Sequence, residues 1–489
     1  MTSETARRLR AGRRTWLAIG VVLLLAVLIA PLAGLSPVLP VFLALLGAVS
    51  VRPVPGLSYV ALVLTVPLGL WFVGLERLVG DAFGGREYAL SISASLVVGV
   101  LFVLTVARGH WHRWHVAAAA VAVVVLGVWS LIGIAHHGVA QTLVGVRLMV
   151  VPLLLLVVLA ALPGDRLAAL VTVMSWLLVA NAVASLAELA VGPARLVQWG
   201  FEEGRAVRYI GETFRVPGLT EFNGELGILA GAYLLGYLAL WLTPGARPTR
   251  WSWHAGGVAA LLCLALSTSR SGALLVAAGV VAAVVVNRSG GVAARRRARL
   301  FGLAVVACLV GAFVAVGATG ARSLFDRFEV WSALLSDDLP PWGRGVGSVG
   351  AATSSRIASG QQIFVDNYFV SLALQFGPVL TVAVVAALGW ALWRLWRLGA
   401  EDQKAVPLTA ILVGLACASL MIEAWEYPGA MMCLGLFVAY ARRPAPARPA
   451  RVLPPAPRIA APVLPPPPSI PAPAAPAPVG PTPDEQPGR

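Results

Sequence analysis

Charged side chains are scarce in this chain. Asp, Glu, Lys and Arg make up 12% of its 489 residues, whereas hydrophobic residues make up 58%. A soluble domain usually carries about 25% charged residues, so this scarcity excludes that class and favours a protein embedded in a membrane. The four cysteines lie singly within apolar runs, which indicates neither a disulfide framework nor a zinc site. We expect neither a bound metal nor another cofactor.

Negative charge is scarcer than positive charge. The chain has 22 Asp and Glu against 37 Lys and Arg, a formal net charge of +15. In a soluble protein this excess would suggest nucleic acid as a partner. Here the arginines gather in short segments between apolar runs, as they do in loops that orient a membrane protein. We expect membrane lipids around the protein, and no nucleic acid bound to it.

Apolar runs of about 14 to 25 residues recur along most of the chain, each long enough for a helix that crosses a bilayer or nearly does. They predict an all-α, polytopic integral membrane protein with about 12 to 14 transmembrane helices. The predicted helices are 16–35, 37–51, 56–75, 89–107, 116–135, 147–162, 167–191, 223–243, 253–268, 272–287, 300–319, 367–396, 406–422 and 428–441.

The arginine distribution predicts the side of the membrane on which each loop lies. If the arginines before residue 15 hold the N-terminus inside, the other arginine-rich loops also fall inside, as the positive-inside rule requires. We therefore expect a cytoplasmic N-terminal segment at 1–15, a transmembrane domain at 16–441 and one long external loop at 320–366. Both termini are then cytoplasmic.

Proline and alanine dominate residues 442–489. Such a composition cannot bury a core, so we expect a disordered cytoplasmic tail. Two interpretations stay open for it: a tail without a specific function, or a proline-rich docking site for a cytoplasmic partner.

The external loop begins with apolar residues at helical spacing. They predict a short amphipathic helix along the membrane surface, and they are Leu324, Phe325, Phe328, Trp331, Leu334 and Leu335. Pro340, Pro341 and the glycines that follow end this helix and leave an irregular loop, of the kind that often carries function. We include Arg344 of this loop among the candidate substrate-binding residues.

Two arginines lie where a permanent cation is costly, at the outer ends of predicted helices. Arg215 precedes the eighth predicted helix, and Arg270 lies in the short break between the ninth and the tenth. Helix N-termini and hydroxyl groups beside them complete a predicted anion site. We assign to it Asn223 as a helix cap, with Ser269 and Ser271 as caps and ligands. In the alternative interpretation, both arginines only reach toward lipid phosphates.

Asp366, Asn367 and Tyr368 lie where the external loop enters the twelfth predicted helix. Asp366 is either an N-cap or the base that takes a proton from an acceptor hydroxyl, and the next two residues are candidates for binding substrate. Other external carboxylates compete for the role of base, namely Glu221, Glu225, Glu423 and Glu426. Glu188 lies within the seventh predicted helix, where pairing with an arginine would offset its burial.

The order of these motifs resembles that of a known family. Arg215 opens an Arg-x-x-Gly segment with a later Asn, Arg270 lies in a Ser-Arg-Ser-Gly break, and the external loop carries Trp-Gly-Arg-Gly-Val-Gly and then Asp-Asn-Tyr. From Arg215 to Gly377 the chain looks like the O-antigen ligase and polymerase family of polytopic glycosyltransferases. The resemblance implies a GT-C-like architecture. It also implies glycan transfer from undecaprenyl diphosphate to a glycan or lipid acceptor, outside the bacterial cytoplasmic membrane, without metal or nucleotide sugar.

Carried over by position, Arg215 and Arg270 correspond to the family's arginines near the lipid diphosphate. Ligases that act on lipopolysaccharide typically carry a histidine before the Asn that is Asn367 here, where this chain has Asp366. No histidine lies between residues 322 and 365. The resemblance therefore implies catalytic roles for Asp366, Arg215 and Arg270, and it favours a polymerase or a ligase with another acceptor.

A transporter or flippase of an anionic lipid or solute is the alternative function, and a noncatalytic membrane scaffold is a third. A transporter should carry ionisable residues near the middle of several helices and broken helices in paired positions. Apart from Glu188 and Asn181, the sequence has few such residues within its predicted helices. The polar groups gather instead at one side of the membrane, which favours transfer.

Overall fold

The computed structural model describes residues 113–162, 164–199, 207–210, 212–243, 247–287, 322–336, 339–350, 365–398 and 405–442, together with scattered residues elsewhere. The predicted N-terminal segment and the first three predicted helices lie outside the described residues. So do most residues of the fourth and eleventh predicted helices and nearly all of the tail rich in proline and alanine.

Helices dominate the described part of the chain. They are α6 (Arg113–His137), α7 (Val139–Ala161), α8 (Gly164–Val191), α9 (Pro193–Gln198), α10 (Asn223–Leu242), α11 (Trp251–Ser267), α12 (Arg270–Val286), α14 (Arg322–Ser336), α15 (Tyr368–Leu398), α16 (Ala405–Ala418) and α17 (Pro428–Ala441). A 3₁₀ turn, η3 (Ala424–Glu426), lies between α16 and α17. Two short strands, β1 (Arg208–Ile210) and β2 (Thr213–Arg215), form an antiparallel hairpin.

Most predicted helices in the described part are confirmed with small shifts of their ends, but α7 begins at Val139 instead of residue 147. Its first turns contain Gln141, Thr142 and Gly145. These residues interrupt the apolar run, so the sequence pattern did not predict the start of the helix. These polar and small residues are buried. They face another part of the protein, because Gln141 donates a hydrogen bond to the carbonyl of Gly347.

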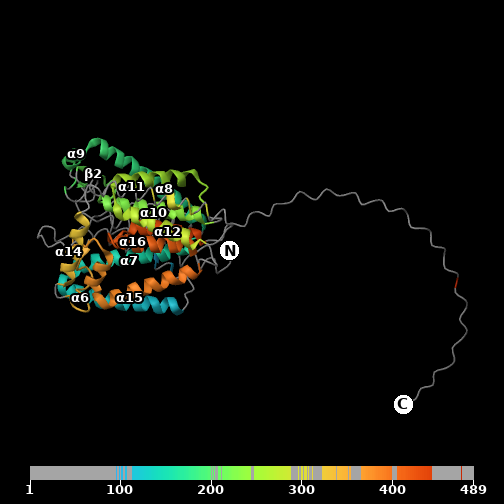
Figure 1. Ribbon diagram of the computed structural model, residues 1–489. Helices are drawn as coiled ribbons and strands as arrows, with labels where there is room; N and C mark the ends of the chain where they lie inside the picture. The colour runs from blue at the N-terminus through green and yellow to red at the C-terminus, as the bar shows by residue number, and fades with distance from the viewer. Residues whose placement is uncertain are drawn as a thin grey trace, which may run out of the picture. The chain divides into compact units, whose positions relative to one another are not determined.

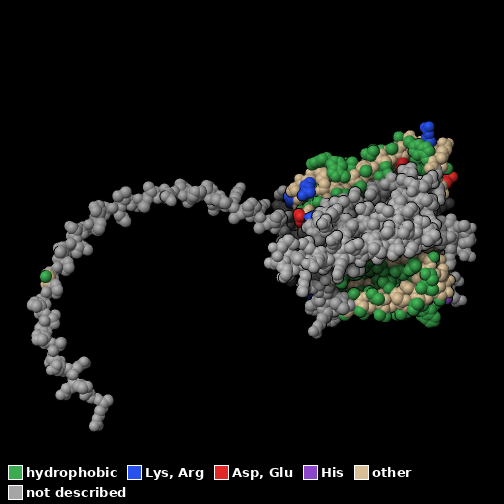
Figure 2. Space-filling view, turned by 180° about the vertical axis from the view of Figure 1, so that it is seen from behind, with side chains coloured by type: hydrophobic (Ala, Val, Ile, Leu, Met, Phe, Trp, Pro, Cys, Tyr) green, Lys and Arg blue, Asp and Glu red, His purple; other side chains and the backbone are tan. Residues whose placement is uncertain are grey.

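Among the residues that the structure describes, five helices are long and apolar enough to cross a bilayer, and they are α6, α7, α8, α10 and α15; α11, α12, α16 and α17 are shorter apolar helices. Exposed valines lie on α6 and α15, where Val123 is 69% and Val382 is 68% exposed, and α15 also carries exposed tryptophans. In Figure 2 the described surface is mostly hydrophobic or backbone, with charged side chains toward its two ends. This is an all-α membrane protein, with outward apolar side chains suited to lipid.

Helix α10 is the centre of the bundle. It packs against α11, α12 and α17, while α12 also packs against α16 and α11 against α8. Figure 1 shows these helices side by side, with β2, α9 and α14 together at one end. Glycines allow α10 and α12 to approach closely: a Cβ added to Gly231 would lie 2.7 Å from the carbonyl oxygen of Gly272. Small residues at helix contacts are how apolar helices gain packing in lipid.

Replacing Gly231 by alanine should lower the free energy of unfolding by about 1–3 kcal/mol, because the new methyl group has no room against Gly272. Gly389 in α15 is the matched control, since a Cβ there meets nothing within 4 Å. Gly389→Ala should leave stability unchanged or raise it by up to about 1 kcal/mol through helix propensity. Thermal unfolding of both purified variants in detergent is the measurement. Equal midpoints would show that this contact is not tight.

The glycine-rich segment, residues 343–350, packs against α6, α7 and α15. Helix α15 is kinked at Gly377 (φ 83°) and Pro378. Proline lacks the N–H that would bond the carbonyl four residues earlier, which is Leu374. That carbonyl accepts instead from the backbone N–H of Arg344 at 2.7 Å, and the next one, of Gln375, accepts from Gly345 at 3.0 Å. The segment is therefore a buried brace that supports the kinked helix; that this loop carries function stays a prediction.

Helix α14 confirms the predicted helix at 322–336, but its apolar residues do not share one environment. Trp331 is buried and Leu334 packs with it against Val349 and Val365. Phe328 remains 58% exposed and Leu335 41% exposed. One edge of α14 therefore packs against the bundle, and the residues between α14 and α15 form part of that contact.

Candidate functional site

The β1–β2 hairpin places two arginines opposite each other. Its antiparallel register pairs Arg208 with Arg215, and side chains of directly opposed residues lie on the same face of a hairpin. The guanidinium of Arg208 lies over the ring of Phe222, 5.3 Å from its centroid. The hairpin precedes α10, so it holds both cations beside the N-terminal end of that helix.

Arg215 binds the turn that joins α11 to α12. Its Nε donates to the hydroxyl of Thr268 at 3.0 Å, and its NH2 donates to the Thr268 carbonyl at 3.3 Å. Thr268 has a left-handed backbone (φ 50°), which a β-branched residue rarely adopts and which costs about 1–3 kcal/mol. The arginine therefore helps to hold a strained turn. The sequence predicted Arg215 as a site residue but did not predict its hydrogen bonds to Thr268.

The same turn supplies the N-terminus of α12. The Ser269 hydroxyl accepts from the backbone N–H of Gly272 at 3.4 Å and so caps the helix, as predicted. Ser269 and Ser271 hydroxyls lie 3.0 Å apart, and both residues are buried. Arg270 lies between them as the first residue of α12. A cation and two hydroxyls thus meet at the positive end of a helix dipole.

Four arginines gather here, and we call Arg208, Arg215, Arg270 and Arg327 the arginine cluster. Burial, and next the positive charges of the other three arginines, lower the pKa of Arg215 from 12.5 to about 10, while the charge of Asp366 opposes this shift. Arg215 still carries its charge at neutral pH. Like charges at close range repel; Asp366 offsets this repulsion in part, and a further anion would lower it more. Arg208 and Arg327 were missed from sequence.

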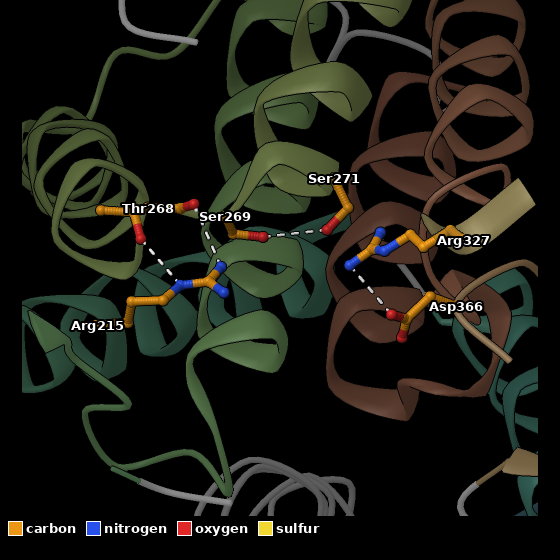
Figure 3. A network of polar contacts seen from close by, with 6 residues as sticks. All are labelled: Arg215, Thr268, Ser269, Ser271, Arg327 and Asp366. Atoms are coloured by element: carbon orange, nitrogen blue, oxygen red, sulfur yellow. Dashed lines mark hydrogen bonds and ion pairs between the residues drawn. The ribbon is translucent and has the colours of Figure 1, made fainter. Parts of the chain in front are cut away.

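Asp366 forms an ion pair with Arg327 of α14, with Asp366 Oδ2 3.0 Å from Arg327 NH2. Figure 3 shows Arg327 and Arg215 pointing toward each other from opposite sides of the view, with the hydroxyls of Ser269 and Ser271 between them. The N-cap of α15 is Asn367, whose Oδ1 accepts from the backbone N–H of Phe369 at 2.9 Å. The cap alternative for Asp366 is therefore wrong, since its carboxylate serves the ion pair.

Two predicted site residues have other tasks. Asn223 does not cap α10, which begins at Asn223 itself after Phe222; its amide donates to the carbonyl of Ser267 at 3.2 Å. It therefore ties α10 to the end of α11. Tyr368 donates its backbone N–H to the Ser419 carbonyl at 2.8 Å, which ties α15 to the end of α16. Both contacts hold together the helix ends that surround the site.

Arg344 belongs to the glycine-rich segment, where its carbonyl lies 3.0 Å from Nε2 of His137. Its position follows from the brace on α15, and the described contacts give it no place in the arginine cluster. Glu188 of α8 accepts a hydrogen bond from the backbone N–H of Gly218 at 2.8 Å, and Asn181 accepts one from Leu219 at 3.0 Å. These two polar residues of α8 therefore fix the turn between Arg215 and α10.

Buried carboxyl groups lie beside Asp366. Glu423 is 8% and Glu426 6% exposed, at the turn from α16 into α17. Burial, and next the charge of Glu426, raise the pKa of Glu423 well above 4.5; a hydrogen bond with Ser371 opposes this, and Asp366 adds to it. Burial raises the pKa of Glu426 to about 8. Sequence reasoning named both glutamates only as competing bases.

Stability should therefore depend on pH through Glu426. Its folded pKa, about 8, lies above the usual 4.5, so its contribution is fully present below about pH 4.5 and is lost as pH rises through about 8. We expect the wild type to unfold at a lower temperature at about pH 9 than at about pH 6, and Glu426→Gln to reduce this difference. Glu329→Gln, which changes an exposed residue of α14, is the control. A Glu426→Gln variant as pH-sensitive as the wild type would contradict the assignment.

Among the residues that the structure describes, no group of three or more His, Cys, Asp or Glu side chains is arranged to hold a metal ion. The chemistry available here is that of guanidinium groups, hydroxyls, helix N-termini and carboxyls. Such a site can bind an anion and accept a proton. Comparison with models of known protein families, with curated proteins and with solved structures gives no match for this chain.

Proposed function

We propose that this membrane protein transfers a glycan from undecaprenyl diphosphate to a hydroxyl of a glycan or lipid acceptor, on the outer side of the bacterial cytoplasmic membrane. The proposal rests on the resemblance of residues 215 to 377 to O-antigen ligases and polymerases. It gains support from one observation, which is that Arg215, Arg270 and Asp366, far apart in sequence, lie near one another at the same end of the bundle.

The arginine cluster suits the donor's leaving group. When the bond between the anomeric carbon and the phosphate oxygen breaks, the diphosphate departs with the electron pair and gains negative charge. Guanidinium groups and a helix N-terminus that are already in place stabilise such charge without reorganisation. The anionic diphosphate lowers the repulsion within the cluster when it binds, and the charge that it gains on departure lowers it further. An anion with more than one charge is therefore the ligand that this cluster favours.

Asp366 suits the acceptor. The acceptor oxygen forms the new bond to the anomeric carbon, and its proton passes to a carboxylate. In Figure 3 Asp366 and Arg215 lie on opposite sides of Ser269 and Ser271, so the attacking hydroxyl and the leaving diphosphate would lie on opposite sides of the transferred sugar. In the resting protein the Asp366 carboxylate is engaged in its ion pair with Arg327. A diphosphate that attracts Arg327 would release Asp366 for this step.

The experiment is a transfer assay with purified wild-type protein in liposomes. The donor is a glycan on undecaprenyl diphosphate, and the product is a new glycosidic bond detected by mass spectrometry. The alternative function, transport, predicts that the same donor crosses the bilayer unchanged. Donor that moves across the membrane without a new bond would overturn the proposal and favour the flippase.

Sidedness gives a separate prediction. Trp342 is 57% exposed and lies in the predicted external loop, while Arg442 is exposed after α17, on the predicted cytoplasmic side. In a background without native cysteines, Trp342→Cys should react with a membrane-impermeant maleimide added to whole cells, and Arg442→Cys should not. The reverse pattern would invert the topology. Ser348 is unsuitable as the external position because it is only 4% exposed.

A further inference from the structure

Thr268 adopts a backbone conformation that its side chain disfavours. Among the residues that the structure describes, it is the only one other than glycine with a positive φ, 50°. It follows the last residue of α11 in the left-handed conformation, where helices commonly carry a glycine because a residue without Cβ adopts it at no steric cost. A turn that served the fold alone would therefore be better made by glycine. Strain of this kind is kept where the side chain has a function.

Hydrogen bonds from residues 215–223 hold the end of α11 in this conformation. The last carbonyl groups of a helix lack partners within it. Here each successive carbonyl accepts from outside, Leu266 from the N–H of Val216 at 3.4 Å, Ser267 from the amide of Asn223 at 3.2 Å and Thr268 from Arg215 at 3.3 Å. The turn cannot relax without breaking these bonds, which is how a strained residue persists in a folded protein.

Thr268 binds one edge of the Arg215 guanidinium. The Nε–H donates to the Thr268 hydroxyl at 3.0 Å, and one terminal NH2 group donates to the Thr268 carbonyl at 3.3 Å. These two donors form one planar fork of the guanidinium. Two of its five N–H donors are used in this way, which leaves three. Two of those three form a second fork at the outer end of the group, and the described residues supply no acceptor for it.

The second fork faces the rest of the arginine cluster. Figure 3 shows the outer end of the Arg215 guanidinium directed toward the hydroxyls of Ser269 and Ser271, with Arg327 beyond them. The N-terminus of α12 lies at the same place, since Ser269 caps that helix. A fork of two N–H groups matches two oxygens of one phosphate. Thr268 therefore occupies the edge of Arg215 that faces the turn and leaves the edge that faces the other cations.

We propose that Thr268 is a positioning residue for the lipid diphosphate, because it holds one edge of Arg215 so that the other edge faces the phosphate oxygens. This rests on the proposed function for the class of ligand, a prenyl diphosphate. Thr268 acts through Arg215 and does not touch the ligand. A guanidinium that is already fixed avoids the cost of ordering a long, flexible side chain when the diphosphate binds. This gain explains why a strained threonine occupies a position that suits glycine.

Binding of farnesyl diphosphate, a short prenyl diphosphate without a sugar, tests the proposal by isothermal titration of purified protein in detergent. Thr268→Val keeps the β-branched shape but loses the hydroxyl acceptor, so its Kd should rise about 10-fold or more. Thr268→Ser keeps the hydroxyl and should retain most of the affinity. Thr268→Gly relieves the strain, so it should stay folded and yet bind as weakly as the valine variant.

A matched control and a second background make the result specific. The Thr172 hydroxyl also accepts from an arginine, Arg250, at 3.2 Å, but this pair lies at the opposite end of α11. Thr172→Val should therefore leave the Kd unchanged. In an Arg215→Ala background, Thr268→Val should have no further effect on the Kd, because Thr268 acts through the missing guanidinium. A purely structural residue would add its effect in both backgrounds.

Wild-type affinity in Thr268→Val or in Thr268→Gly would overturn the positioning role. So would a serine variant as weak as the valine variant, an equal effect of Thr268→Val with and without Arg215, or a wild type that binds no farnesyl diphosphate. The transfer assay judges the proposed function separately. If the wild type binds the probe in the expected pattern but forms no glycosidic bond, glycan transfer fails while Thr268 keeps its role in diphosphate binding.

Discussion

Arg270→Ala is expected to lower the rate of glycan transfer by a factor of at least about 100, because removing one preorganised donor to a developing negative charge typically costs that much. Arg270 is the first residue of α12, between two buried serines and within the arginine cluster. The positive charge of Arg270 therefore lies at the N-terminus of α12, where the helix dipole is also positive. The measurement is kcat for wild type and variant at equal protein level, with the undecaprenyl-diphosphate glycan as donor.

Two further variants make the result specific. Arg270→Lys keeps the charge but loses the planar fork that grips two phosphate oxygens, so it should also lose most activity. Arg394→Ala removes an arginine near the other end of α15, where it stacks on Trp390, and should leave kcat unchanged. Full activity in Arg270→Ala would remove this residue from the site, and the anion would then be assigned to Arg208, Arg215 and Arg327.

Asp366→Asn should slow transfer by about 100-fold or more with little effect on folding. The variant keeps the shape of the side chain but cannot take a proton. Because Asn367 caps α15, the helix start should survive the change. The side chains of the ion pair with Arg327 are 49% and 37% exposed, so its loss should change the free energy of unfolding by less than about 1 kcal/mol.

The comparison variant for this prediction is Glu329→Gln, which removes a carboxylate from α14 two residues after Arg327. It should match the wild type in both rate and thermal stability. Near-normal turnover in Asp366→Asn would instead pass the role of base to Glu225 or to the buried glutamates at the turn from α16 into α17. A large drop in melting temperature would indicate that the ion pair serves the fold, and the rate could then not be attributed to proton transfer.

The sequence predicted the helices well wherever apolar periodicity was uninterrupted. Helix α17 has the predicted bounds, and α10 begins at the predicted residue, 223. The start of α7 was missed because its buried polar residues bind the glycine-rich segment and not lipid. Hydropathy measures transfer into an apolar phase, so it fails where a helix end is buried among polar partners.

The site was predicted in part. Arg215, Arg270 and Asp366 were predicted as candidate site residues because each is a charged residue at the end of an apolar helix. A charge is costly at that position unless it has a functional or structural partner. Arg208 was missed because it reaches the site through the register of a three-residue hairpin, which no helical period reveals. Arg327 was missed because it lies on the polar side of an amphipathic helix, where charges are ordinary. Long-range placement of such residues follows from packing that local patterns do not contain.

The brace between residues 343–350 and α15 has a consequence for exchanging parts between related chains. The amides of Arg344 and Gly345 supply the hydrogen bonds that Pro378 cannot, so the two segments are complementary halves of one repaired helix. In a chimera that takes the loop from one parent and the helix from another, the backbone carbonyls of Leu374 and Gln375 would lose these hydrogen bonds while remaining buried. Recombination boundaries should therefore fall before Leu339 and after the kink, so that both halves are inherited together.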